Sequence, residues 1–70
     1  MGDAYTVSLE AARVNKGLTQ EEAAKELGIS KTTLVNWEKG NTFPDVVKFK
    51  AICNLYSVPM GLISVPDKLD

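Results

Sequence analysis

Four neighbouring side chains in the middle of the chain carry a set of groups that is unusual for a solvent-facing helix. At about 100° per residue, one face of the segment after Ser30 presents Lys31, Thr32, Val35 and Asn36. An ordinary exposed face would mix glutamate and lysine, and a solvated face remains the alternative interpretation. This face instead offers an ammonium, a hydroxyl, methyls and a carboxamide, which are the groups that contact base edges in the major groove.

Each of these groups has a preferred partner on a base pair. The carboxamide of Asn36 can bond adenine through two hydrogen bonds, and the ammonium of Lys31 can donate to guanine. Val35 or the methyl of Thr32 can pack on a thymine methyl. We therefore expect these four side chains to face solvent together, free of partners within the chain.

The element that carries this face is expected to be the second of two short helices joined by a tight turn. Thr19 can cap the first helix, and Glu22, three residues on, can complete a capping box. Gly28 stands where the first helix must end with φ > 0. Ser30 can cap the second helix, which is expected to end at Gly40. Ser8 and Asp45 are the expected caps of two further helices, one before and one after this pair.

Apolar residues at helical spacing predict that the whole chain is all-α, a compact bundle of five short helices. Ala24 is small where the two central helices would cross, and Leu34 and Trp37 form the inward stripe of the second. The remaining expected core positions are Leu9, Ala12, Leu18, Ala23, Leu27, Ile29, Val46, Phe49, Ile52, Cys53 and Tyr56. A short last helix is expected over residues 60–63, although Gly61 weakens it.

Between about Leu9 and Ile63 the chain resembles the Cro/repressor type of helix–turn–helix transcription regulator. The resemblance rests on Gln20, Ala24, Gly28, Leu34, the WEKG sequence that ends at Gly40, and Pro44. It implies a λ-repressor-like DNA-binding domain. Ser57 departs from the family pattern, which usually has glycine there. The end of the helix that begins after Asp45 is therefore expected to differ or to be slightly strained.

The resemblance also implies roles for individual residues. An arginine and a glutamate of the family correspond to Arg13 and Glu38, which are expected to form an ion pair between the first and third helices. Gln20 is expected to bond a DNA phosphate, helped by the helix N-terminus. The full set expected to contact phosphates is Gln20, Thr33, Lys39, Asn41 and Thr42. Lys48 and Lys50 are expected to point outward, as solvated lysines or distal phosphate contacts.

Composition limits the function classes. Seventy residues predict one domain (1–70), with a core over about 8–64, an N-terminal arm (1–7) and a C-terminal tail (65–70). The chain has no histidine and one cysteine, so we expect no enzyme, no catalytic residues, no metal site and no cofactor. It contains no apolar stretch of membrane-spanning length, and we expect a cytoplasmic protein. The net charge of −1 is low for a protein that grips phosphates.

The expected function is therefore sequence-specific regulation of transcription on double-stranded operator DNA, by a Cro-like phage or prophage type of protein. A homodimer is expected, with the apolar residues Leu62, Val65 and Leu69 as its interface. No small-molecule substrate is expected. The low positive charge favours an alternative, an antirepressor that binds a repressor protein through the same surface. An antitoxin that represses its own operon would use the same chemistry as the regulator.

Overall fold

Four α-helices make up most of the structure, a computed structural model that describes residues 7–64. They are α1 (Leu9–Lys16), α2 (Gln20–Leu27), α3 (Lys31–Lys39) and α4 (Val46–Tyr56). Each helix begins after a polar residue whose side chain accepts a hydrogen bond from the backbone N–H three residues on. These capping residues are Ser8, Thr19, Ser30 and Asp45. Thr19 and Glu22 form the complete capping box, so all four predicted helix starts are confirmed.

The helix ends follow the left-handed backbone conformation that the glycines predict. Gly28, in the turn between α2 and α3, has φ 71°, a conformation that L side chains rarely adopt. Ser57 ends α4 in the same conformation, with φ 61° and ψ 44°, although it has a side chain. The Ser57 hydroxyl accepts a hydrogen bond from Lys16 Nζ at 3.0 Å. The helix therefore ends as in a glycine-containing chain, but on a residue for which that backbone is unfavourable.

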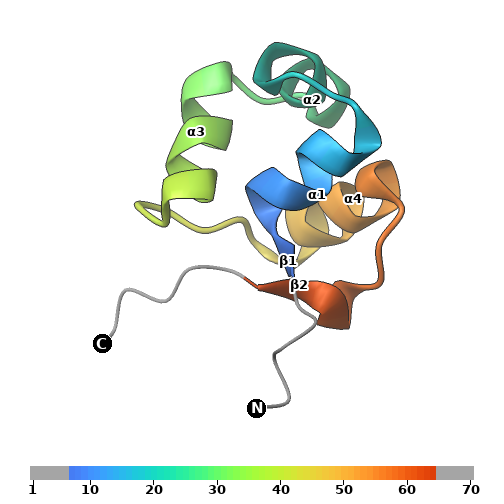
Figure 1. Cartoon of the computed structure of the whole chain (residues 1–70). Coiled ribbons are helices and arrows are strands. Elements are labelled where there is room, and N and C mark those ends of the chain that lie inside the picture. The colour runs from blue at the N-terminus through green and yellow to red at the C-terminus, as the bar shows by residue number, and fades with distance from the viewer. Residues whose placement is uncertain (1–6, 65–70) are drawn as a thin grey trace.

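The core lies where α2 packs against α3 and α4 and where α1 contacts α3 and α4 (Figure 1). Leu9, Leu34 and Ile52, from three different helices, have almost no exposed surface. The other buried apolar residues are Ala12, Ala23, Ala24, Leu27, Trp37, Cys53, Tyr56 and Ile63. In Figure 1, α3 lies at one side of the bundle. Its Leu34 and Trp37 are buried, whereas Lys31, Thr32 and Lys39 are exposed.

The last predicted helix is wrong in type. Residues Met60–Leu62 form a single 3₁₀ turn (η2), and the chain then becomes extended at Ile63. Strand β2 (Ile63–Ser64) pairs in parallel with strand β1 (Val7–Ser8), in register Val7 with Ile63. A segment of four residues that contains Gly61 is too short to propagate an α-helix. The arm predicted over residues 1–7 therefore contributes its last residue to a strand pair.

Two predictions for the start of α4 are also wrong. Val46, expected in the core, is 69% exposed, because it lies in the first turn of α4, where no element among residues 7–64 covers it. Lys48, expected to point outward, donates from Nζ to the Leu27 carbonyl at 3.3 Å. That carbonyl belongs to the last turn of α2, where carbonyls lack partners within the helix and a cation is favoured.

Candidate nucleic-acid interface

The outward face of α3 is available to a partner, although less of it is fully exposed than the sequence predicts. Lys31 and Thr32 are exposed, whereas Val35 and Asn36 are partly buried. Leu34 and Trp37 are buried in the core and anchor α3 against it. The four predicted base-reading side chains are thus on the side of α3 that does not form the core.

Two of these four side chains have partners within the chain, which corrects the prediction that they are free. Lys31 Nζ lies 2.8 Å from Glu21 Oε2, in an ion pair that joins the first turns of α2 and α3. This hydrogen bond, more than the charge of Lys31 alone, lowers the pKa of the Glu21 carboxyl. Asn41 Nδ2 donates to Asn36 Oδ1 at 3.2 Å. Both contacts join residues of different elements, which spacing along one helix does not reveal.

Beneath α3, the ion pair that the family resemblance implied is present and buried. Arg13 Nε donates to Glu38 Oε2 at 2.8 Å, and the two side chains are 8% and 4% exposed. A second nitrogen of the guanidinium, Nη1, donates to the Leu18 carbonyl at 2.7 Å. The bond to Glu38 raises the pKa of Arg13, which stays charged. We call this pair and the residues bonded to it the Arg13–Glu38 seam.

Gln20 belongs to the same seam, which sequence reasoning missed. Gln20 Nε2 donates to Glu38 Oε1 at 3.1 Å, so the carboxylate has a donor on each oxygen. An amide nitrogen has two N–H donors, and this bond uses one of them. The seam therefore fixes the carboxamide at the N-terminus of α2 while leaving a donor and the carbonyl for another partner. The residue types allow this bond, but Gln20 and Glu38 are 18 positions apart, so no local pattern along the chain predicts it.

Tyr56 lies close enough to the seam to sense both of its charges. Its hydroxyl is buried and has no hydrogen-bond partner among residues 7–64. Burial raises the pKa of Tyr56 to about 12, with a smaller raising effect from Glu38 and a lowering effect from Arg13. The phenol is therefore neutral at physiological pH and adds an unpaired polar atom to the core.

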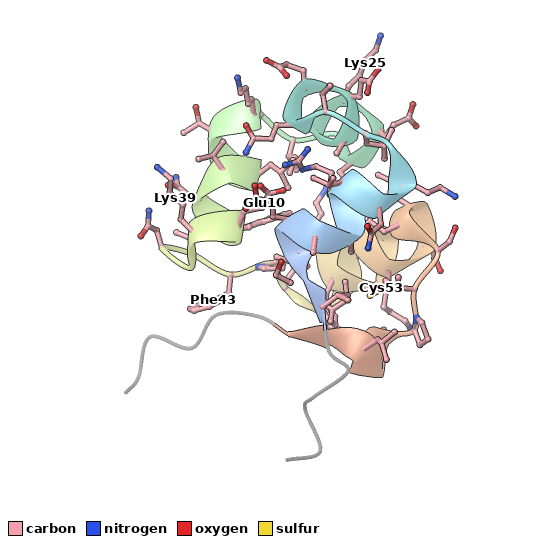
Figure 2. All side chains as sticks on the ribbon, viewed as in Figure 1. Glu10, Lys25, Lys39, Phe43 and Cys53 are labelled. Carbon is pink, nitrogen blue, oxygen red and sulfur yellow. The ribbon has the colours of Figure 1, made fainter. Side chains whose placement is uncertain are left out.

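The remaining predicted phosphate contacts lie around the two ends of α3. The Thr33 hydroxyl is 3.0 Å from that of Ser30 at the N-terminal end. At the C-terminal end Lys39 and Asn41 are exposed, and Figure 2 shows Lys39 directed outward from the helix. Thr42 is exposed, and its N–H donates to the Asn36 carbonyl at 3.4 Å. Lys39 has no ion-pair partner within the described part of the chain.

Exposed apolar side chains gather at a place that sequence reasoning did not identify. Of the predicted interface residues, Leu62 is 37% exposed, and Val65 and Leu69 lie outside the described residues. Phe43, in the loop after α3 (Figure 2), and Val46 and Val47, in the first turn of α4, expose more. A cavity of about 220 Å³ lies here, lined by Phe43, Pro44, Asp45, Val46 and Phe49. We call this region the α4 entry patch.

Three further observations concern metal ligands, the cysteine and helix hydropathy. Residues 7–64 contain no cluster of three or more side chains that could hold a metal ion. Cys53 is buried, and burial raises the pKa of its thiol, which is the opposite of what a reactive cysteine needs. No helix within this range has the length and hydropathy of a membrane span.

Comparison with known proteins agrees with this geometry. The helix-turn-helix family model matches residues 9–63. The chain is 40% identical over 61 residues to the HTH-type transcriptional regulator ImmR of Bacillus subtilis, covering 87% of this chain and 48% of that protein. It is 35% identical over 54 residues to the HTH-type transcriptional activator BcrR of Enterococcus faecalis, covering 77% of this chain and 26% of that protein.

A third relative is a phage protein. The chain is 30% identical over 57 residues to the cryptic phage CTXphi transcriptional repressor RstR of Vibrio cholerae, covering 81% of this chain and 51% of that protein. The chain thus spans between about a quarter and half of these relatives. No solved structure matches it significantly. The match over residues 9–63, on a structure with the expected paired helices, shows that the chain belongs to the helix-turn-helix family of Cro/repressor-type regulators.

Proposed function

We propose that this chain regulates transcription by binding double-stranded operator DNA, with α3 in the major groove. The observation that carries the proposal is the outward face of α3, where Lys31, Thr32, Val35 and Asn36 lie opposite the core-forming Leu34 and Trp37. Their groups match the donors, acceptors and methyls on base edges. The relatives include both an activator and a repressor, so the direction of regulation is not part of the proposal.

Phosphate contacts would set the position of α3 on the duplex. Gln20 is the main candidate, because Glu38 fixes its carboxamide at the N-terminus of α2, where the helix dipole favours an anion. Thr33, Lys39, Asn41 and Thr42 would contact phosphates on either side. Such contacts supply affinity without sequence information. We infer the cytoplasm as the location, since that is where promoter DNA lies in bacteria.

We further propose that the chain acts as a homodimer on a roughly palindromic site. One domain covers a single half-site, and two copies about 34 Å apart would double the base contacts. Leu62, with Val65 and Leu69, is the predicted interface, and the α4 entry patch is a second exposed apolar surface that could serve. A small domain with net charge −1 is expected to bind DNA phosphates weakly, so contacts to a second half-site would add needed affinity.

A second candidate function is binding to a repressor protein as an antirepressor. The specific observation in its favour is the α4 entry patch, where Phe43, Val46 and Val47 are 49%, 69% and 74% exposed. Exposed apolar side chains that lie together often mark protein–protein contacts. An antitoxin that represses its own operon would bind DNA as the regulator does.

The test is selection of double-stranded DNA from a random pool with the full chain, at low salt and then at physiological salt. We expect enrichment of one motif with two-fold symmetry, together with dimers in sedimentation at micromolar concentration. A monomer that binds no DNA even at low salt, where phosphate contacts are strongest, would overturn the proposal in favour of the protein-binding function. Enrichment of an asymmetric single site would overturn only the dimer.

A further inference from the structure

The ion pair between Glu21 and Lys31 places a carboxylate next to a side chain proposed to read bases. Glu21 follows Gln20 in the first turn of α2, and its Oε2 accepts from Lys31 Nζ at 2.8 Å. The two side chains are 67% and 52% exposed, so packing does not force them together. The contact therefore persists only while nothing competes for either partner, and DNA phosphate would compete for the ammonium.

We propose that Glu21 is a specificity-determining residue, which lowers the affinity for arbitrary DNA by holding the ammonium of Lys31. The inference rests on the proposed function. Affinity for non-specific DNA comes almost entirely from cations that neutralise phosphates and release counterions. A lysine bonded to Glu21 neutralises a phosphate less effectively, because the adjacent carboxylate offsets much of its charge.

A correct site does not impose the same loss. The ammonium of Lys31 has three N–H donors, of which Glu21 uses one. The other two remain for the acceptors O6 and N7 of guanine. Lys31 can therefore donate to guanine in a specific complex while it keeps its bond to Glu21. The pair thus weakens binding to arbitrary sequences more than binding to the operator, and the ratio of the two affinities rises.

The charge balance of the chain makes this effect matter. Eight basic side chains stand against nine acidic ones, so each lysine near the DNA is a large share of the available positive charge. Releasing Lys31 for one phosphate contact should steepen the slope of log affinity against log salt by about 0.9. Between 50 and 200 mM salt that slope corresponds to roughly a 3- to 4-fold change in affinity.

The experiment measures operator and arbitrary DNA binding of the full chain over a range of salt, for the wild type and Glu21→Gln. Glu26→Gln is the matched control, because Glu26 is also exposed on α2 and lies about 140° around the helix from Glu21. Both variants change the net charge equally. Glu22 is unsuitable as a control because its side chain belongs to the capping box.

We expect Glu21→Gln to raise the affinity for arbitrary DNA several-fold more than Glu26→Gln does, with the steeper salt slope and a smaller operator preference. In a Lys31→Gln background the two glutamate variants should become equivalent. Equal effects of the two variants in the wild-type background, or an extra gain that survives without Lys31, would overturn the inference alone. A wild-type chain that binds no DNA would instead overturn the proposed function, and this inference with it.

Discussion

The two ion pairs that α3 makes lie in opposite surroundings. Arg13 and Glu38, beneath the helix, are 8% and 4% exposed, and Glu38 also receives a bond from Gln20. Lys31 and Glu21, at its N-terminal edge, are both more than half exposed. The N–O distance is 2.8 Å in each pair, so distance does not separate them. The two pairs differ in solvation. Exposed charges in water gain little stability from each other, whereas a buried charge that loses its partner destabilises the fold.

This difference suggests a division of roles on the two sides of one helix. The buried pair fixes the orientation of α3 against α1 and α2, and a partner at the surface cannot displace it. The exposed pair can be exchanged for contacts to another molecule, with little change in the stability of the fold. We therefore expect substitutions in the Arg13–Glu38 pair to change the free energy of unfolding, and substitutions in the Glu21–Lys31 pair to change DNA binding.

The largest effect is expected from Glu38→Ala. It leaves the guanidinium of Arg13 buried without its carboxylate, and breaking a buried pair in this way costs about 3–5 kcal/mol. We expect a loss near the lower end, about 3 kcal/mol in the free energy of unfolding by denaturant titration. Glu10→Ala is the control, since Glu10 is 66% exposed and only 4.0 Å from the same guanidinium. Equal losses for the two variants would contradict the buried role.

A second variant tests whether the uncompensated charge of Arg13 causes the loss of stability. The double variant Arg13→Met with Glu38→Leu removes both charges and fills the seam with apolar groups of similar size. We expect it to unfold at higher denaturant concentration than Glu38→Ala alone, because no uncompensated charge remains. A double variant less stable than the single one would show that shape rather than charge dominates at this position.

Tyr56→Phe should have a smaller effect, and in the opposite direction. The buried hydroxyl has no partner among residues 7–64, so its removal at pH 7 should leave the stability unchanged or raise it by about 1 kcal/mol. Burial raises the folded pKa to about 12 from 10.0, so the unfolded chain loses this proton first. The wild type should therefore lose about 2–3 kcal/mol between pH 10 and 12 that the variant keeps. Parallel pH profiles of the two proteins would contradict this assignment.

Asn41→Ala addresses the other contact at the exposed side of α3. The Asn41 side chain donates to the side-chain oxygen of Asn36 and helps to orient that amide. Removing the Asn41 amide should therefore weaken the preference for adenine at one position by about 0.5–1 kcal/mol without unfolding the chain. Competition binding with single-base operator variants measures this preference. Asn54→Ala, an exposed asparagine of α4, is the control. A uniform loss over all sequences would mean that Asn41 acts only through its proposed phosphate contact and does not orient the Asn36 side chain for base reading.

The smallest effect on stability is expected from Glu21→Gln. The pair with Lys31 is solvated on both sides, and such pairs contribute little to folding. Thermal unfolding at neutral pH should be the same as for the wild type within error. A clear loss of stability would show that the pair helps to position α3, and the contrast between the two pairs would then disappear.

The sequence predicted the parts of this structure that depend on local chemistry. Ser8, Thr19, Ser30 and Asp45 are the helix caps, because an N-cap bond needs only a short polar side chain three residues before a backbone N–H. The all-α class and the positions of the four main helices followed from these signals. The Arg13–Glu38 pair came from the family resemblance and is present.

What the sequence missed depends on how separate elements meet. The bonds from Gln20 to Glu38 and from Lys31 to Glu21 join side chains of different helices, and helical periodicity gives no distance between helices. Val46 fits the periodicity of α4 but lies where no element in the described part of the chain covers it. The pairing of Val7 with Ile63 joins the two ends of the fold through backbone atoms that no residue pattern marks.

The most direct test of base reading by α3 compares Asn36→Ala with Gln20→Ala on the operator and on its single-base variants. Asn36→Ala should relax the preference at one base pair, at a cost of about 1–3 kcal/mol on the operator and much less on arbitrary DNA. Gln20→Ala should weaken binding to all sequences alike, as expected for a phosphate contact. If Asn36→Ala also weakened every sequence equally, α3 would not read bases through this residue, and the central claim would be contradicted.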